Sequence, residues 1–148
     1  MLHQDNVMVT EKPLVVQAAL DVVGAPNHGA ITTFIGAVRN HNHNKEVIGV
    51  TYDVFSALAE TVFYTLCEEA HQQWGDDLTI YIAHYRGRLD VGGVSVIIAV
   101  GSPHRREACD ACRYIIEALK QRAPIWKQEH YVDGNSEWVK GHALCTHT

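Results

Sequence analysis

The chain has 148 residues, of which 47% are hydrophobic and 20% are charged, a composition typical of a single globular domain with a buried core. Its 12 basic and 17 acidic residues give a formal charge of -5, which argues against binding to nucleic acid or to an anionic membrane surface. No apolar run approaches the roughly 20 residues of a membrane helix, and the first dozen residues lack a secretion signal. The 4 cysteines are too few for a disulfide scaffold. We therefore expect one cytoplasmic domain over residues 1–148.

The first third of the chain contains a short helix and two strands. Pro13, followed by an apolar run that stops at Gly24, predicts the helix. The β-branched and apolar residues 29–39 predict a buried strand, the polar residues 40–46 predict a loop, and residues 47–55 predict a second strand.

The middle of the chain contains a long helix and two more strands. Ser56 is expected to cap a helix that runs through Trp74, because apolar residues recur there at helical spacing. Residues 78–85 and 94–100 predict strands, joined by a glycine-rich turn over residues 86–93.

A second long helix and a hairpin complete the predicted fold. We expect Ser102 to cap the helix, which runs to about Arg122 and stops before Pro124. Residues 125–132 and 137–141 predict a hairpin around the turn at residues 133–135. The mixture of strands and helices predicts an α+β fold with a mixed or antiparallel sheet and two long helices.

Basic residues concentrate in one segment. Residues 104–127 contain 6 basic and 3 acidic residues, a local charge of +3 within a chain of -5. At the start of this segment, Pro103 would occupy the first helical position, with His104 and Arg105 in the first turn. Free backbone N–H groups, an imidazole and a guanidinium could then bind a phosphate there. A solvated basic turn is the alternative.

Two lysines lie near the end of the same helix. Lys120 and Lys127 flank a stiff segment that contains Trp126, and a lysine held near other cations can have a lowered pKa and exchange protons near neutral pH. Two ordinary surface lysines are the alternative. His104 lies 16 residues before Lys120, or about 24 Å along an unbroken helix. A small ligand could contact both only if a second copy of the chain contributed one of them, which predicts a homodimer with composite sites.

Arg39 follows a predicted strand directly and is a second candidate for binding an anion, the alternative being a pair with a surface carboxylate. Cys109 and Cys112 have the spacing of half a zinc site, but no second such pair exists and Cys112 falls on the apolar stripe of the helix, so core packing is expected. No cysteine lies in an obviously activating setting, so a transferred group would need a nucleophile from elsewhere.

Several motifs in a fixed order carry a family resemblance. They are FIGAVRNHN (residues 34–42), HYRGRL (84–89), SPHR (102–105), LK (119–120) and APIWKQE (123–129), followed by Asp133-Gly134 and Trp138-Val139. Together they resemble the large, catalytic subunit of molybdopterin synthase over about residues 28–140. A departure is Ala37, where the family often has a basic residue. The chain beyond Gly141 matches nothing useful in the family, and flexible termini are expected.

The resemblance implies an α/β hammerhead fold and a homodimer of this chain within a heterotetramer. Each copy would bind a small ubiquitin-like sulfur-carrier subunit with a C-terminal Gly-Gly thiocarboxylate. This sulfurtransferase would move sulfur to cyclic pyranopterin monophosphate and so make molybdopterin, without a cofactor, a metal, nucleic acid or a membrane.

The family also implies roles for single residues. Lys120 and Lys127 would be catalytic, with Lys127 stabilising an oxyanion or protonating leaving groups and Lys120 orienting the thiocarboxylate. The wider substrate-binding set comprises Ala37, Val38, Arg39, His104, Arg105, Lys120, Lys127, Gln128 and Glu129. Two other classes stay open: a non-catalytic binding module for the sulfur carrier, and a metal-responsive protein that uses Cys109, Cys112 and the histidines.

Overall fold

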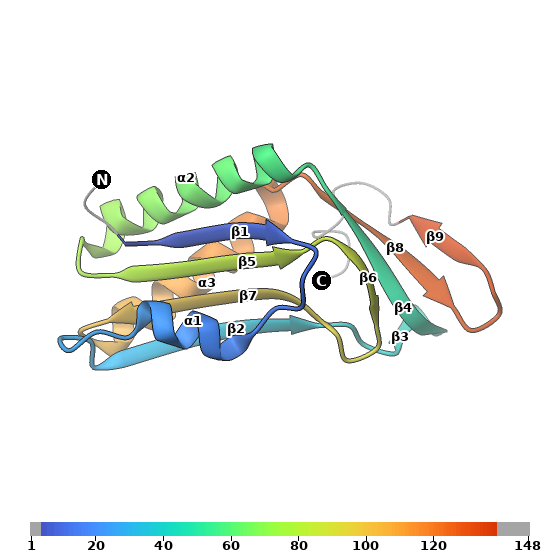
Figure 1. The fold of residues 1–148 in the computed structure, drawn as a ribbon, viewed down its shortest axis with the longest axis horizontal. Coiled ribbons are helices and arrows are strands. Elements are labelled where there is room, and N and C mark those ends of the chain that lie inside the picture. The colour runs from blue at the N-terminus through green and yellow to red at the C-terminus, as the bar shows by residue number, and fades with distance from the viewer. Residues whose placement is uncertain (1–3, 139–148) are drawn as a thin grey trace.

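The computed structural model describes residues 4–138, which form three helices and two sheets (Figure 1). The elements are, in chain order, β1 (Asn6–Thr10), α1 (Val16–Val23), β2 (Ala30–Ala37), β3 (His41–Asn42), β4 (Lys45–Val54), α2 (Ser56–Trp74), β5 (Thr79–Tyr85), β6 (Gly87–Asp90), β7 (Val94–Ser102), α3 (Arg105–Arg122), β8 (Ile125–Tyr131) and β9 (Ser136–Trp138). The predicted α+β class with two long helices is confirmed. No helix in this range is long and apolar enough to cross a membrane.

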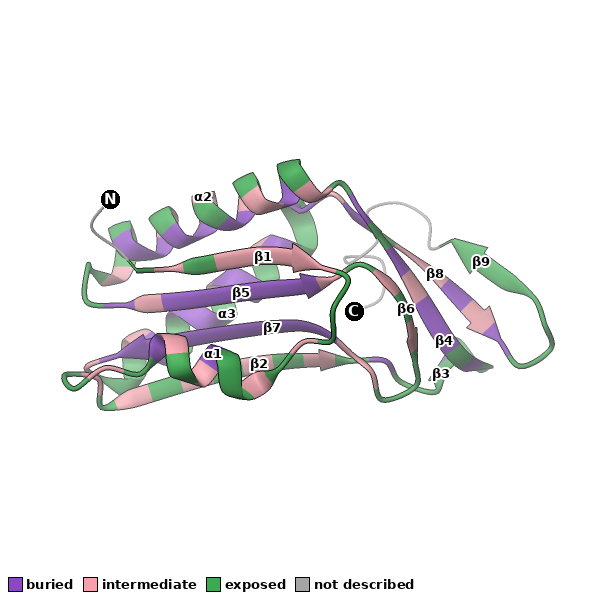
Figure 2. Cartoon of the chain, in the orientation of Figure 1, coloured by how far each residue is buried: buried purple, intermediate pink, exposed green. Residues whose placement is uncertain are grey.

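The first sheet has the strand order β1-β5-β7-β2 and is mixed, because β1 runs parallel to β5 while the other pairs are antiparallel. The long helices α2 and α3 pack on one face, whereas the short α1 covers only the central strands β5 and β7 on the other, where Ile31 and Ile35 of the edge strand β2 are exposed (Figure 1). Since side chains alternate along a strand, Ile80 and Ile82 of β5 face the long helices, whereas Tyr81 and Ala83 face α1. This double burial explains why β5 and β7 are nearly continuous apolar runs (Figure 2).

The second sheet lies across one end of the first, which gives the hammerhead arrangement (Figure 1). Its strand order is β3-β4-β8-β9, and β6 pairs with β4. β4 and β8 join in a long antiparallel ladder that brings Tyr52 opposite Lys127. Five connections therefore cross between the sheets: β2 to β3, β4 through α2 to β5, β5 to β6, β6 to β7, and β7 through α3 to β8.

The helix starts differ from the predicted ones. Ser56 is the first residue of α2, not its cap: the cap position is Phe55, without a side-chain hydrogen bond. Ser102 is still part of β7, so α3 begins only at Arg105, with the extended His104 as its cap. The prediction that Ser102 caps this helix is wrong; its Oγ instead accepts a hydrogen bond from the backbone N–H of His104 at 3.3 Å. Pro103 consequently lies before the helix.

Several short elements were not predicted. β1, β3 and β6 appear where no strand was expected, and α1 begins at Val16, three residues after Pro13. The predicted loop at residues 40–46 is a hairpin instead, with its two-residue turn at His43 and Asn44, both of which have positive φ angles. The end of the predicted final strand, residues 139–141, lies outside the described residues.

Candidate functional site

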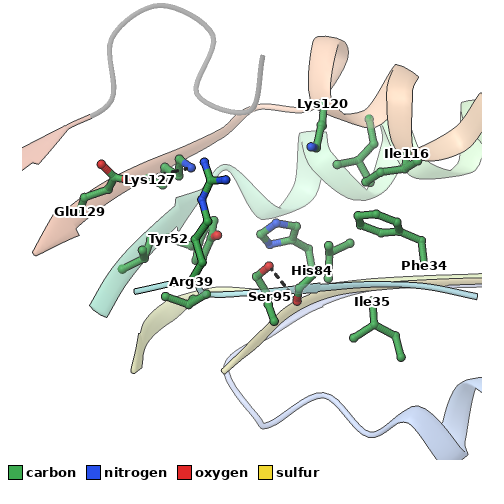
Figure 3. Close-up of a pocket in the computed structure, with 16 residues that line it drawn as sticks. Phe34, Ile35, Arg39, Tyr52, His84, Ser95, Ile116, Lys120, Lys127 and Glu129 are labelled. Atoms are coloured by element: carbon green, nitrogen blue, oxygen red, sulfur yellow. Dashed lines mark hydrogen bonds and ion pairs between the residues drawn. The ribbon is translucent and has the colours of Figure 1, made fainter. Parts of the chain in front are cut away.

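A cavity of about 330 Å³ lies where the two sheets meet the last turns of α3 (Figure 3). It is lined by residues of β2, β4, β5, β7, α3 and β8, and by the chain that follows β2. Because its walls come from elements spread over about a hundred residues of sequence, the cavity exists only in the folded chain.

An irregularity in the first sheet shapes one wall of this cavity. The β2–β7 register shifts after Gly36, which leaves Ser95 as the extra residue of a bulge. The Ser95 hydroxyl donates a hydrogen bond to the carbonyl of Gly36 at 3.3 Å. The bulge turns the chain at the end of β2, and Val38 and Arg39, just beyond it, line the cavity.

Three cations from three different segments line the cavity. Arg39 follows β2, Lys120 lies in the last turn of α3, and Lys127 lies in β8 (Figure 3). The side chain of Lys127 is only 18% exposed. Burial lowers the pKa of Lys127, and the like charges of Arg39 and Lys120 lower it further, against the carboxylate of Glu129, which raises it. Lys127 therefore gives up a proton more readily than an ordinary lysine.

Glu129 is a fixed anion beside these cations. Its Oε2 lies 4.0 Å from Nζ of Lys127. Its two carboxylate oxygens accept hydrogen bonds from Nδ2 of Asn42, both at 3.0 Å, and Oε1 also accepts one from the Tyr131 hydroxyl at 3.1 Å. These donors compensate the burial of the carboxylate and leave the cavity with a net positive lining.

The floor of the cavity is polar but uncharged. The ring of His84 is 1% exposed and meets the ring of Tyr52 edge-on, with 5.1 Å between centroids. Burial lowers the pKa of His84 to about 4 and raises that of Tyr52, so both side chains are neutral near pH 7. The lining of the cavity therefore has cations on one side and neutral hydrogen-bonding groups on the other. It suits a ligand that combines an anionic group with a polar ring system.

The predicted site residues fall into two groups. Ala37, Val38, Arg39, Lys120, Lys127 and Glu129 line the cavity, whereas His104, Arg105 and Gln128 do not. Gln128 lies between two lining residues on β8, where alternation turns its side chain away, and its Nε2 donates a hydrogen bond to Ser136 Oγ at 2.8 Å. His104 and Arg105 lie at the opposite end of α3 from Lys120, as the helix length predicts. Their roles stay predictions.

Sequence reasoning missed Tyr52, His84 and Ser95. Each lies in a strand whose apolar neighbours predict core packing. The available signal was the placement of a polar side chain within an otherwise apolar strand, which is unfavourable unless the group finds a partner.

The alternative interpretations of the charged residues have different outcomes within residues 4–138. Arg39 forms no ion pair with a carboxylate in that range, and Lys127 is largely buried. Lys120, His104 and Arg105 are exposed, as a surface lysine and a solvated basic turn would be. No cluster of histidine, cysteine or acidic side chains within residues 4–138 could hold a metal. Cys112 is buried on the apolar stripe of α3, as predicted, whereas Cys109 is exposed, so the expectation of core packing is wrong for Cys109. Near the end of the sequence, His142, Cys145 and His147 could also bind a metal, but they lie outside the described residues.

A second cavity, of about 540 Å³, lies between the start of β1 and the end of α2. Its charged lining residues are Asp5, Glu68, His71 and Asp76. Because acidic groups dominate there, it does not suit an anionic ligand, and the first cavity is the candidate functional site.

Comparison with known proteins gives a consistent result. The family model described as "MoaE protein" matches residues 9–122, from β1 to the end of α3. A relative from Synechococcus elongatus, named molybdopterin synthase catalytic subunit, is 48% identical over 143 residues, which cover 97% of this chain and 86% of the relative. A relative of the same name from Halalkalibacterium halodurans is 39% identical, with 88% and 83% covered.

The fold is also similar to solved structures. Molybdopterin synthase from Staphylococcus aureus superimposes with a TM-score of 0.86 at 28% sequence identity, covering 90% of this chain and 96% of that one. The MoaE protein from Burkholderia ambifaria superimposes with a TM-score of 0.77 at 26% identity, covering 91% and 88%.

Proposed function

This chain belongs to the MoaE protein family, and on that basis we propose that it acts as the catalytic subunit of a molybdopterin synthase in molybdenum cofactor biosynthesis. The name "catalytic subunit", shared by relatives up to 48% identical, implies that the working enzyme contains a further subunit. The partner that we propose is the small ubiquitin-like sulfur carrier, and the substrate is cyclic pyranopterin monophosphate.

The reaction that we propose is sulfur transfer from the carrier's C-terminal thiocarboxylate to the pterin substrate. The thiocarboxylate sulfur forms a bond to a substrate carbon as the bond from that carbon to an oxygen leaving group breaks, and the departing oxygen takes up a proton. Water then attacks the carrier's acyl carbon and breaks its bond to this sulfur. The carrier leaves as a carboxylate, and the sulfur stays on the product. Two of the cysteines in residues 4–138, Cys67 and Cys112, are buried. Burial raises the pKa of the Cys67 thiol and raises that of Cys112 to about 11, so neither is a ready nucleophile near neutral pH. A sulfur donor from outside the chain is consistent with this.

The observation that carries the proposal is the convergence of Arg39, Lys120 and Lys127 on one cavity in a chain whose net charge is -5. An anionic thiocarboxylate and a phosphate would both be attracted to this lining. Attack of water on the acyl carbon passes through a tetrahedral oxyanion, which a nearby ammonium stabilises. We assign this task to Lys127, whose lowered pKa also suits protonation of a leaving group, and we assign orientation of the thiocarboxylate to Lys120.

A second copy of the chain would complete the site. His104 and Arg105 lie 16 and 15 residues before Lys120 on α3, so they are about 22–24 Å away along the helix axis. A homodimer that brought the start of one α3 to the end of the other would add an imidazole and a guanidinium to the cavity. The phosphate of the substrate is the group that they would bind.

Reconstitution with the thiocarboxylated carrier and cyclic pyranopterin monophosphate tests the proposal. Wild-type protein should form molybdopterin and convert the carrier thiocarboxylate to carboxylate, both of which mass spectrometry detects. Lys120→Ala and Lys127→Ala should each lower the rate at least about 100-fold while carrier binding stays measurable. The exposed Arg113 of α3 pairs with Glu117, and Arg113→Ala is the matched control. Carrier binding without loss of the thiocarboxylate would instead indicate a non-catalytic binding module.

A further inference from the structure

His84 is a buried polar side chain of the cavity that the sulfur-transfer scheme leaves without a role. It lies in β5 on the same face as Ile80 and Ile82, contacts Tyr52 of the second sheet, and lines the cavity with only 1% of its surface exposed. Its ring rises from the sheet toward the side of the cavity where Lys120 lies (Figure 3). A histidine in such a place needs hydrogen-bond partners for both ring nitrogens, because an unsatisfied buried polar atom is costly.

One ring nitrogen has its partner within the chain. Nδ1 of His84 lies 2.8 Å from the carbonyl oxygen of Tyr85. Since a carbonyl oxygen only accepts, Nδ1 must carry the proton. The ring is neutral, because burial lowers its pKa to about 4. The tautomer is therefore defined, and Nε2 carries a lone pair that can only accept a hydrogen bond.

The other ring nitrogen lacks a partner among residues 4–138. No hydrogen bond to Nε2 of His84 is present in that range, and its ring neighbour is the edge of Tyr52, with apolar Phe34 and Val96 also lining the cavity. The cavity therefore presents a fixed acceptor in its neutral floor, away from the bulk of solvent. The complementary group is an uncharged N–H or O–H donor on the bound molecule.

We infer that Nε2 of His84 accepts a hydrogen bond from an N–H or O–H group of the pterin substrate and so helps to select and orient it. The inference rests on the proposed function, which supplies a substrate whose ring system carries such donors. His84 is then a specificity-determining residue: the cations attract the anionic part of the ligand, and the imidazole recognises its ring. Because a site built around a hydrogen bond disfavours ligands that lack the donor, this contact discriminates against analogues.

A pair of substitutions separates the two nitrogens of the ring. The shorter amide side chain of His84→Asn can still donate to the carbonyl of Tyr85, but it cannot place an acceptor where Nε2 lies. The longer side chain of His84→Gln reaches that position with its amide oxygen. We expect His84→Asn to raise KM for cyclic pyranopterin monophosphate by about 3- to 10-fold with kcat changed less than about twofold, and His84→Gln to restore most of the loss.

The control substitution is His130→Asn. His130 lies in β8 of the second sheet, hydrogen-bonds to Thr51 at 2.7 Å and does not line the cavity, so KM should stay at the wild-type value. Wild-type KM in a folded His84→Asn protein would overturn the inference and leave the proposed function intact. A fall in kcat with unchanged KM would also overturn it. Failure of the wild-type protein to make any product would overturn the proposed function, and the inference with it.

Nitrogen NMR of wild-type protein labelled with 15N-histidine makes the test independent of variant folding. Nδ1 of His84 should resonate as a protonated nitrogen and Nε2 as an unprotonated one. Addition of cyclic pyranopterin monophosphate, without the carrier, should move the Nε2 resonance in the direction of hydrogen bonding and leave the Nδ1 proton in place. A proton on Nε2, or an Nε2 resonance that does not shift when the substrate binds, would contradict the inference.

Discussion

Acid should destabilise this protein through His84, and His84→Gln should remove that part of the pH dependence. The ordinary pKa of histidine is 6.5, and burial in the fold lowers that of His84 to about 4. Between these values the unfolded chain binds a proton that the folded chain excludes, so stability is lost as the pH falls from 6.5 toward 4. Linkage gives a loss of about 2 kcal/mol at pH 5.0 and about 3 kcal/mol at and below pH 4.

The groups around His84 do not change between the two proteins. The Tyr52 phenol packs against the ring, and Arg39, Lys120, Lys127 and Glu129 line the same cavity; all of them are present in His84→Gln. The variant therefore isolates the proton on the imidazole.

Urea unfolding, followed by tryptophan fluorescence at one protein concentration, measures the effect at pH 7.5 and 5.0. Wild-type protein should lose about 2 kcal/mol more than His84→Gln between the two pH values. His41, exposed on β3, provides a control in His41→Gln, which should keep the wild-type pH dependence. Equal losses in wild type and His84→Gln would refute the reasoning that His84 is held neutral by burial.

Three other substitutions test the packing and electrostatics of the fold. Gly36→Ala should lower the free energy of unfolding by about 1–3 kcal/mol, because the new methyl group would lie 2.6 Å from a valine side chain on β7; a loss under about 0.5 kcal/mol in urea would contradict this close packing. Burial alone would lower the pKa of His71, but hydrogen bonds to Asp5 and to a backbone carbonyl raise it. Asp5→Asn should therefore destabilise the protein by about 3 kcal/mol near pH 6, and the loss should shrink as the pH rises through that raised pKa; a loss independent of pH would exclude an ion pair. Arg39→Gln should raise the pKa of Lys127 in NMR titrations of 13C-methylated protein, and an unchanged pKa would show that the two charges do not interact.

The long periodic elements could be predicted because the spacing of their apolar residues indicates which face is buried. In α3, apolar residues recur at helical spacing, and the stripe that they form is buried at every position: Ala108, Ala111, Cys112, Ile115 and Leu119. Strands β5 and β7 are similarly clear, since apolar side chains fill both of their faces. Local pattern and tertiary packing agree in these elements.

The short strands could not be predicted because distant contacts hold them in place. In β1, the carboxylate of Glu60 accepts a hydrogen bond from the N–H of Val9 at 2.9 Å, and Asp5, just before the strand, accepts one from the N–H of Ile80 at 2.9 Å. Each contact spans more than fifty residues, and no local pattern encodes it. β6 is four residues, GRLD, and is a strand because it pairs with β4.

The cations of the site were predictable, whereas its neutral floor was not. Charge clustering and family motifs pointed to Arg39, Lys120, Lys127 and Glu129, and all four line the cavity. The participation of His84 depends on how the two sheets meet, which no local pattern reports. An apolar strand predicts burial for its residues but does not say that a cavity opens beside one of them.

The cavity lies between the two sheets, so its geometry depends on how the sheets are oriented relative to each other. Arg39 belongs to the chain leaving the first sheet, Lys127 to the second sheet, and Lys120 to the helix that connects them. The spacing of these charges therefore depends on the angle between two sheets that share one hydrophobic core. A substitution at a crossing segment would change that angle, so inactive variants far from the cavity should be sought among the residues of these crossings.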